Sequence, residues 1–155
     1  MMIVMLDDLD RRILRNLQAD PTQSIPDLAD HLGLTASRLS RRLEKLREGG
    51  VLRGSRAVID WQALGYTVEV SLRVTLDKTN PRAFDEFIPA ARQIPEVLEI
   101  QTFLGQVDVR LSLIARDMRH YQTIYREKIL YLPHMADIEA LTHVARIKTN
   151  KGLPL

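Results

Sequence analysis

Residues 25–48, IPDLADHLGLTASRLSRRLEKLRE, decide the fold of the first part of this chain. Apolar side chains recur at helical spacing before Gly33, a residue that readily takes the positive φ with which many helices end. Thr35 then offers a side-chain oxygen that can cap a second helix. The stretch therefore predicts two short helices that meet at a sharp corner, as in a helix-turn-helix motif.

The second of these helices has a basic outer side. Apolar residues at spacings of three and four define the face that it buries: Leu39, Leu43 and Leu46. Rotation by about 100° per residue from Leu39 places Arg41, Lys45 and Arg38 at about 200°, 240° and 260°, on one narrow stripe away from the buried face. Such a stripe can contact the phosphates and guanine edges of DNA.

A row of cations on a helix is usually a solvated face, so the distribution of charge decides between two interpretations. Between residues 34 and 56 there are seven basic residues and two acidic ones, whereas the whole chain has a net charge of +2. The charge is thus concentrated where a DNA-reading helix needs it. The residues that we expect to contact DNA are Thr35, Ser37, Arg38, Ser40, Arg41, Arg42, Lys45, Arg53 and Arg56.

Composition limits the remaining classes of protein. The chain has 155 residues, of which 45% are hydrophobic, enough for one domain or two small ones with real cores. It has no cysteine, which excludes disulfides and thiolate-bound zinc. No apolar run approaches the roughly 20 residues of a membrane span, and the first residues, MMIVMLDDLD, lack a basic region and a cleavage site. We expect a cytoplasmic protein with no membrane association, no cofactor and no metal.

The flanking segments complete a small N-terminal domain. Residues 6–17 carry an apolar stripe at helical spacing and predict a first helix. A glycine pair ends the basic helix, and residues 51–60 then mix β-branched residues with arginines, as in a short extended strand. We therefore expect a three-helix, winged helix-turn-helix domain with a hinge strand over residues 1–60, and a second domain over residues 61–155. Trp61, the only tryptophan, is expected to pack between them.

The second domain begins with residues 67–76, which alternate strictly between apolar and polar, as in a strand with one buried and one wet face. The elements predicted after it are a helix from Asn80-Pro81 to Ile94-Pro95, strands over 97–104 and 109–115, a helix over 118–132 and a strand over 138–148. The order βαββαβ is that of a ferredoxin-like domain, so the chain is predicted to be α+β. Helices cover one face of such a sheet, and we expect self-association to cover the other.

The chain resembles the Lrp/AsnC, or feast/famine, family of transcription regulators, and the resemblance runs over essentially its whole length. Segments that match family motifs follow in the same order: LDDLDRRIL at 6–14, GLTASRLSRRLEKL at 33–46, GVLRGSRAVIDWQALG at 50–65, GQVDV at 105–109, ILYLPHM at 129–135 and LPL at 153–155. No one motif is decisive, but their collinearity is.

The resemblance implies a RAM-type βαββαβ domain that builds a homodimer, often assembled further into tetramers or octamers. The two helix-turn-helix domains of the dimer would bind double-stranded DNA at a roughly palindromic site. It also implies an amino-acid effector between dimers, with Gly105, Gln106 and Asp108 at the glycine-aspartate turn as the residues to test. Gln106 stands where the family often has aspartate, and Val109 where it often has tyrosine. A neutral amide cannot neutralise an ammonium group, so these departures put the effector site in question.

Two other classes of function remain open. The chain also resembles the two-domain plan of the sirohaem decarboxylases, but their histidine has no counterpart in residues 96–104, EVLEIQTFL. The four histidines of the chain show none of the spacings typical of metal sites, and no nucleophile or phosphate-binding motif is present. A module for oligomerisation or effector binding without DNA activity is the third reading, and it would leave the basic stripe without a role.

Overall fold

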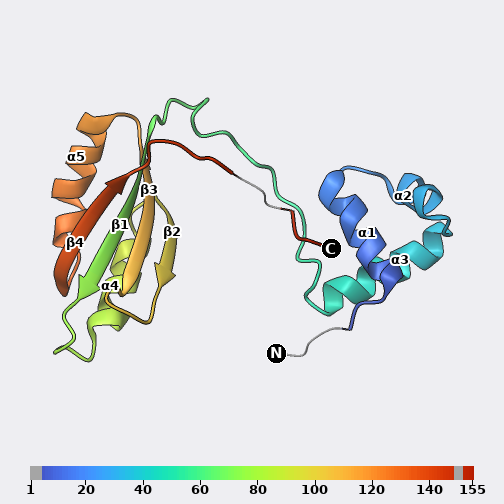
Figure 1. The fold of residues 1–155 in the computed structure, drawn as a ribbon, viewed down its shortest axis with the longest axis horizontal. Helices are drawn as coiled ribbons and strands as arrows, with labels where there is room; N and C mark the ends of the chain where they lie inside the picture. The colour runs from blue at the N-terminus through green and yellow to red at the C-terminus, as the bar shows by residue number, and fades with distance from the viewer. Residues whose placement is uncertain (1–4, 149–151) are drawn as a thin grey trace. The chain divides into compact units, whose positions relative to one another are not determined.

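The computed structural model describes residues 5–148 and 152–155. Two compact units make up the chain (Figure 1). The first, here called the head, runs up to Val58 and also takes in Lys148 and residues 152–155. The second, the sheet unit, runs from Ile59 to Ile147. The predicted α+β class, with a helix-turn-helix domain followed by a ferredoxin-like domain, is confirmed.

The described part of the head contains three helices, and each begins at a side-chain cap. They are α1 (Asp8–Ala19), α2 (Ile25–Leu32) and α3 (Ala36–Glu48). The caps Asp7, Ser24 and Thr35 each accept a hydrogen bond from the backbone N–H three residues further on. Gly33 ends α2 with a φ of 67°, as the sequence predicts. The corner between α2 and α3 is therefore fixed by local chemistry at both helix ends.

The core of the head lies between these helices. The three leucines predicted to form the buried face of α3 are at most 4% exposed, and they pack against Ile13 of α1 and Leu28 of α2. Burial of apolar side chains of this size contributes roughly 1.5–3 kcal/mol each. The helical spacing in the sequence thus identifies the packed face of α3 correctly.

An ion pair joins α3 to the start of α1. The Arg42 guanidinium contacts the carboxylate of Asp7 and that of Asp10, the latter over 3.0 Å. The Asp10 residue is only 4% exposed and also accepts the backbone N–H of Asp7. The backbone N–H of Asp10, and then Arg42, lower the pKa of Asp7, while both carboxylates raise the pKa of Arg42. This Asp7–Asp10–Arg42 clamp ties α3 to the start of α1.

Residues near the end of the chain complete the head. Arg15 donates from Nε to the backbone oxygen of Leu155 over 2.7 Å, and Gln18 donates to the backbone oxygen of Leu153 over 3.3 Å. The Leu155 side chain packs against the apolar core of the head. The head therefore combines α1, α2 and α3 with the last described residues of the chain.

The predicted hinge strand over residues 51–60 is wrong for this chain, since the structure has no strand there. A strand needs a second backbone to receive its hydrogen bonds, and the described residues provide none. The segment is extended without a ladder partner, and its apolar residues Val58 and Ile59 are 76% and 69% exposed.

The sheet unit has four antiparallel strands in the order β2-β3-β1-β4, with two helices on one face (Figure 1). Its elements are β1 (Val68–Leu76), α4 (Ala83–Arg92), β2 (Val97–Thr102), β3 (Val109–Ala115), α5 (Met118–Glu127), a 3₁₀ turn (Ile129–Tyr131) and β4 (Met135–Thr142). The apolar set of β1 packs against Phe87 of α4 and Ile124 of α5. The predicted βαββαβ order is confirmed.

The last helix and the last strand end several residues earlier than the sequence predicts. The helix expected over 118–132 stops at Glu127, and Lys128, with φ −123° and ψ −51°, starts the separate 3₁₀ turn. The strand expected over 138–148 spans Met135–Thr142 instead. Its last ladder contact is the His143 N–H to the Glu69 carbonyl, beyond which β1 offers no further backbone to pair with.

The sheet face opposite the helices, here called the open face, is largely polar. Alternation along the paired strands assigns to it Glu69, Ser71, Arg73, Thr75, Glu99, Gln101, Arg110, Ser112, Ile114, Asp137, Glu139 and Leu141. Arg73 and Arg110 lie directly opposite each other on β1 and β3. Their charges are balanced by Glu139 and Glu99, each 3.6 Å from its arginine.

The clamp gives a first prediction. Arg42→Met should lower the Tm of the head by about 5 °C or more, because it leaves the buried Asp10 carboxylate unpaired. A depressed pKa means that Asp7 contributes stability above its ordinary value of 3.8 and loses it as the pH falls through the lower folded value. The difference between wild type and variant should therefore narrow in acid, as followed by circular dichroism. Arg41→Met, an exposed neighbour on α3, is the control, and an equal loss there would contradict the clamp.

Candidate nucleic-acid interface and ligand regions

The outer side of α3 carries a basic depression. Its volume is about 540 Å³, and it is lined by Thr35, Arg38, Arg41, Arg42 and Lys45. The structure thus brings together five of the nine residues expected to contact DNA. Arg38, Arg41 and Lys45 are exposed, and none of the ion pairs among the described residues involves them. Their charge is free to meet an anion.

The remaining expected DNA contacts lie outside this depression. Ser37 and Ser40 are exposed on α3, and Arg53 and Arg56 are exposed on the extended segment that follows it. The hydroxyl oxygen of Thr35 caps α3 as an acceptor, which leaves its proton available for donation. These positions are open to a ligand, but no contact within the chain ties them to the depression.

The start of α3 adds to the positive potential. Its first turn contains no acidic residue, in contrast to α1 and α2, which have aspartates there. The unpaired N–H groups and the helix dipole at such an end favour a phosphate. The helix end and the arginine stripe therefore both contribute positive potential on α3.

Arg42 behaves differently from its neighbours. Its side chain is 27% exposed, and its guanidinium is held by two carboxylates from the start of α1. The sequence placed it among the DNA contacts because it belongs to the basic run. Its rotation of about 300° from Leu39, close to the buried face, was the signal that it points toward the head.

The turn at residues 105–108 lies at the end of β1. Asp108 is 6% exposed, and one carboxylate oxygen accepts the Leu76 N–H over 2.9 Å. The Asp108 N–H donates to the Val74 carbonyl over 3.0 Å. The carboxylate and the N–H of Asp108 thus both fasten the turn to β1.

Other groups of the turn are more accessible. Gly105 and Gln106 are exposed, and the Gln106 carbonyl accepts a hydrogen bond from Thr75 over 3.0 Å. Lys78 brings its Nζ to 3.4 Å from the Gly105 carbonyl and 3.9 Å from Asp108. Sequence reasoning missed Lys78, although its place just after β1, antiparallel to β3, would put it near this turn.

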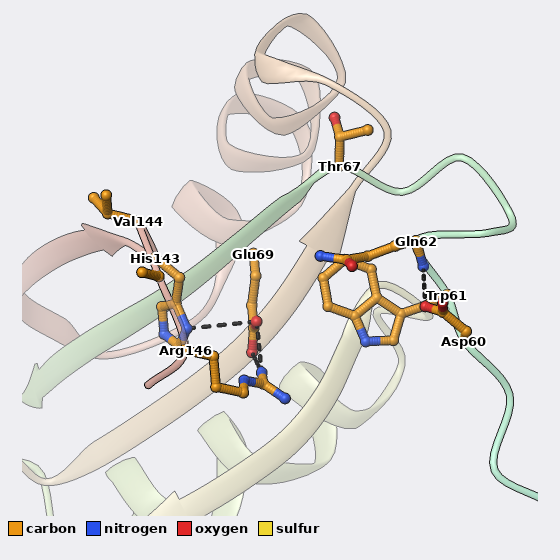
Figure 2. A pocket seen from close by; sticks show the side chains of 9 residues that line it. Asp60, Trp61, Gln62, Thr67, Glu69, His143, Val144 and Arg146 are labelled. Atoms are coloured by element: carbon orange, nitrogen blue, oxygen red, sulfur yellow. Dashed lines mark hydrogen bonds and ion pairs between the residues drawn. The ribbon is translucent and has the colours of Figure 1, made fainter. Parts of the chain in front are cut away.

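A pocket of about 310 Å³ lies at the other end of β1 (Figure 2). Glu69 stands at its centre, with His143 and Arg146 on one side and the indole of Trp61 on the other. Arg146 Nη2 donates to both Glu69 oxygens, over 2.7 and 2.6 Å, and His143 Nδ1 lies 3.5 Å from one of them. Trp61, expected to be plain packing, lines this pocket instead of filling it. Its wall is completed by Asp60, Gln62, Thr67, Val144 and Ala145.

Over residues 5–148 and 152–155, no group of three histidine or acidic side chains is placed to hold a metal ion. Within the same ranges no helix has the length and apolar character to cross a bilayer. His134, at φ 61°, bonds instead to Glu86 over 2.6 Å and to Asn80 over 3.0 Å.

Comparison with known proteins agrees with this architecture. Residues 6–53 match a family model described as winged helix-turn-helix DNA-binding, and residues 69–153 match the Lrp/AsnC ligand binding domain. The Rhodobacter capsulatus proline dehydrogenase transcriptional activator is 33% identical over 132 residues, covering 85% of this chain and 86% of that protein. The DNA-binding transcriptional activator DecR of Escherichia coli is 27% identical, covering 97% of this chain and 99% of its own.

Solved structures show the same likeness. A Neisseria meningitidis transcriptional regulator in complex with L-Met superposes with a TM-score of 0.88 at 25% identity, covering 97% of each chain. An AsnC family transcriptional regulator from Agrobacterium tumefaciens gives a TM-score of 0.85 at 30% identity, covering 96% of this chain and 97% of its own. With the head, the βαββαβ sheet and these matches in agreement, the chain belongs to the Lrp/AsnC family of DNA-binding transcriptional regulators.

Proposed function

We propose that the protein reads operator DNA with α3, acts as a homodimer and responds to a small amino-acid-like effector. The observation that carries the DNA part is the group of three exposed cations without intramolecular partners, Arg38, Arg41 and Lys45, beside a helix start without acidic residues. Soluble surfaces usually intersperse charges of both signs, so a group of cations alone favours an anionic partner. Here such carboxylates are absent from the described contacts of all three.

The proposed contacts follow from helix geometry. A major groove accepts one α-helix, and arginine side chains can donate two hydrogen bonds to the O6 and N7 atoms of guanine. Arg38 and Arg41 are the proposed base-reading residues, with Ser37 and Ser40 beside them. Thr35 and Lys45 are proposed to contact phosphates at the two ends of the stripe. Arg53 and Arg56 lie beyond α3, and we assign them to flanking phosphates.

Arg42 is proposed as a positioning residue. Its guanidinium is held by Asp7 and Asp10, which reduces its capacity to neutralise a phosphate. By fixing α3 to α1 it determines how the stripe is presented. The DNA-contact role expected for Arg42 from the sequence remains a prediction, and the structure favours the indirect role.

The proposed dimer interface is the open face of the sheet. At its centre Ser71 and Ser112 are directly opposite each other, and these small side chains allow another surface to approach closely. The buried Nε of Arg110 has no hydrogen-bond partner among the described residues, and a partner surface could supply its acceptor. A two-fold dimer presents two heads, in keeping with a palindromic site. Tetramers or octamers would build on the same dimer.

The effector is proposed to bind near the turn of residues 105–108, between dimers. A similar regulator was solved with L-Met, which supports an amino-acid-like ligand. In this chain Asp108 is committed to the Leu76 N–H, so the accessible groups of the turn are Gln106, the Gly105 backbone and the Lys78 ammonium. Lys78 is 63% exposed and can hold a carboxylate of the ligand.

We propose no catalytic activity, because the relatives that match over most of the chain are named as transcriptional regulators and not as enzymes. The sirohaem-decarboxylase alternative has no feature of this structure in its favour. A binding module without DNA activity disagrees with the DNA-binding family match of residues 6–53 and with the stripe, and a DNA-binding titration tests it directly. The protein is proposed to act in the cytoplasm.

The decisive experiment is a DNA-binding titration of arginine variants. Arg38→Ala and Arg41→Ala should each weaken specific binding by about 1–3 kcal/mol, since each loses a bidentate base contact. Fluorescence anisotropy on DNA from upstream of the gene, with scrambled competitor, measures this. Arg126→Ala, an exposed arginine of α5, is the matched control and should bind as wild type. Unchanged affinity in both α3 variants would reject the DNA-reading assignment.

Phosphate contacts should behave differently from base contacts. Arg53→Ala and Arg56→Ala should reduce affinity evenly for specific and scrambled DNA, because phosphates are the same in both. Each should flatten the slope of log affinity against log salt by about 1. The same anisotropy assay over a salt series measures both quantities. A loss confined to the specific site would instead assign these arginines to base reading.

The dimer interface can be tested on the open face. Ser112→Glu should convert the protein from dimer to monomer, because it places a charge where two surfaces are proposed to meet closely. Sedimentation velocity measures the change, and affinity for the palindromic site should fall with it. Gln122→Glu, on the exposed side of α5, is the control. A Ser112→Glu protein that remains dimeric would move the interface to another surface.

A further inference from the structure

The pocket at the start of β1 has the chemistry of a ligand site that is separate from the turn of residues 105–108. Glu69 is the second residue of β1, whereas the turn is fastened to Leu76, its last residue. The pocket has a volume of about 310 Å³, which suits a small molecule. No residue of the turn lines it. The sheet unit therefore has a second candidate region at the opposite end of its central strand.

Both signs of charge face this pocket. The Glu69 side chain is 16% exposed and is neutralised by Arg146, which uses only Nη2 for both contacts. The donors on Nε and Nη1 of Arg146 remain unused among the described residues, and the side chain is 49% exposed. Asp60 accepts the Gln62 N–H with one oxygen only, so its second oxygen is available. A cationic and an anionic group are thus both open to a ligand.

An aromatic surface lies between these charges. Trp61 is half-buried, and its indole borders the same pocket (Figure 2). Its N–H makes no hydrogen bond with the described residues, so this donor is available to a ligand. The ring can pack against an aliphatic or aromatic side chain of a ligand while the N–H supports a carboxylate beside Arg146.

We propose that this pocket binds a free amino acid as a zwitterion. Arg146 and the Trp61 N–H hold the α-carboxylate, Asp60 holds the α-ammonium, and the indole face receives the ligand side chain. A ligand with one charge leaves one of the two protein charges unmatched, so both charges are needed for full affinity.

The pocket is lined by residues of the two segments that connect the sheet unit to the head. Asp60, Trp61 and Gln62 belong to the segment by which the chain enters the sheet unit, and His143 and Arg146 to the segment by which it leaves for the head. A bound amino acid contacts both segments at once. Ligand binding is therefore coupled to DNA binding through both connecting segments. By linkage, DNA changes the affinity for the ligand by the same factor by which the ligand changes the affinity for DNA.

The single tryptophan makes the test direct. Emission of Trp61 in the full-length protein without DNA is titrated with the natural amino acids other than tryptophan and tyrosine. For leucine, 4-methyl-2-oxopentanoate lacks the ammonium and 3-methylbutylamine lacks the carboxylate. We expect a saturable change for at least one amino acid and, in the leucine series, binding about tenfold or more weaker for both analogues. No response to any amino acid, or an equal response to the oxo acid, overturns the proposal.

Variants separate this pocket from the turn and from the dimer. Arg146→Met and Asp60→Asn should each abolish the Trp61 response, Arg146→Lys should restore part of it, and Arg92→Met on α4 is the matched control. A response lost in Lys78→Met but kept in Arg146→Met would place the ligand at the turn and overturn the proposal. Emission that changes with protein concentration and not with amino acid would mean that a second copy fills the pocket, which also overturns it. None of these outcomes bears on DNA binding by α3, which is measured separately.

Discussion

The pairing of β1 on both of its edges is the constraint on which the sheet unit depends. Backbone hydrogen bonds join β1 to β3 over Val68–Val74 and to β4 over Val70–Leu76. Its apolar side chains form the centre of the core, and its polar side chains form the middle of the open face. The two candidate ligand regions lie at its two ends, one at Glu69 and one at the Leu76 N–H. A displacement of β1 along its own axis would alter both at once.

In the head, two adjacent arginines of α3 have different surroundings. Arg41 and Arg42 are adjacent in sequence, yet a rotation of about 100° separates their side chains on α3. One faces solvent and the other binds the carboxylates at the start of α1. A buried Asp10 without a cation would be costly, so Arg42 stabilises the head, whereas Arg41 has no ion-pair partner among the described residues. Two adjacent arginines therefore have different surroundings, and the helix geometry is what separates them.

The order of elements could be predicted because local signals agree with the fold. Caps at Asp7 and Thr35, the positive φ of Gly33 and the strict alternation along β1 each follow from a few neighbouring residues. Non-local facts could not be predicted in this way. The arginine stripe was placed by periodicity, but the pairing of Arg42 with α1 depends on how three helices pack.

The same limit applies to the ligand regions and to the ends of elements. Asp108 was placed correctly at its turn, yet its commitment to β1 depends on a strand about thirty residues earlier. The pocket around Trp61 needs side chains from positions 60 and 146 together, which no local pattern connects. The early end of β4 is set by where β1 begins. Each of these requires the register of the sheet.

The return of residues 152–155 to α1 makes the head discontinuous, with the sheet unit inserted between its two parts. During synthesis on the ribosome the three helices emerge first, but their last packing partner emerges only after the sheet unit has been made. A nascent chain thus cannot complete its head before its sheet is available. In evolution, replacing such a head with another would require two compatible junctions instead of one, which favours inheritance of the two units together.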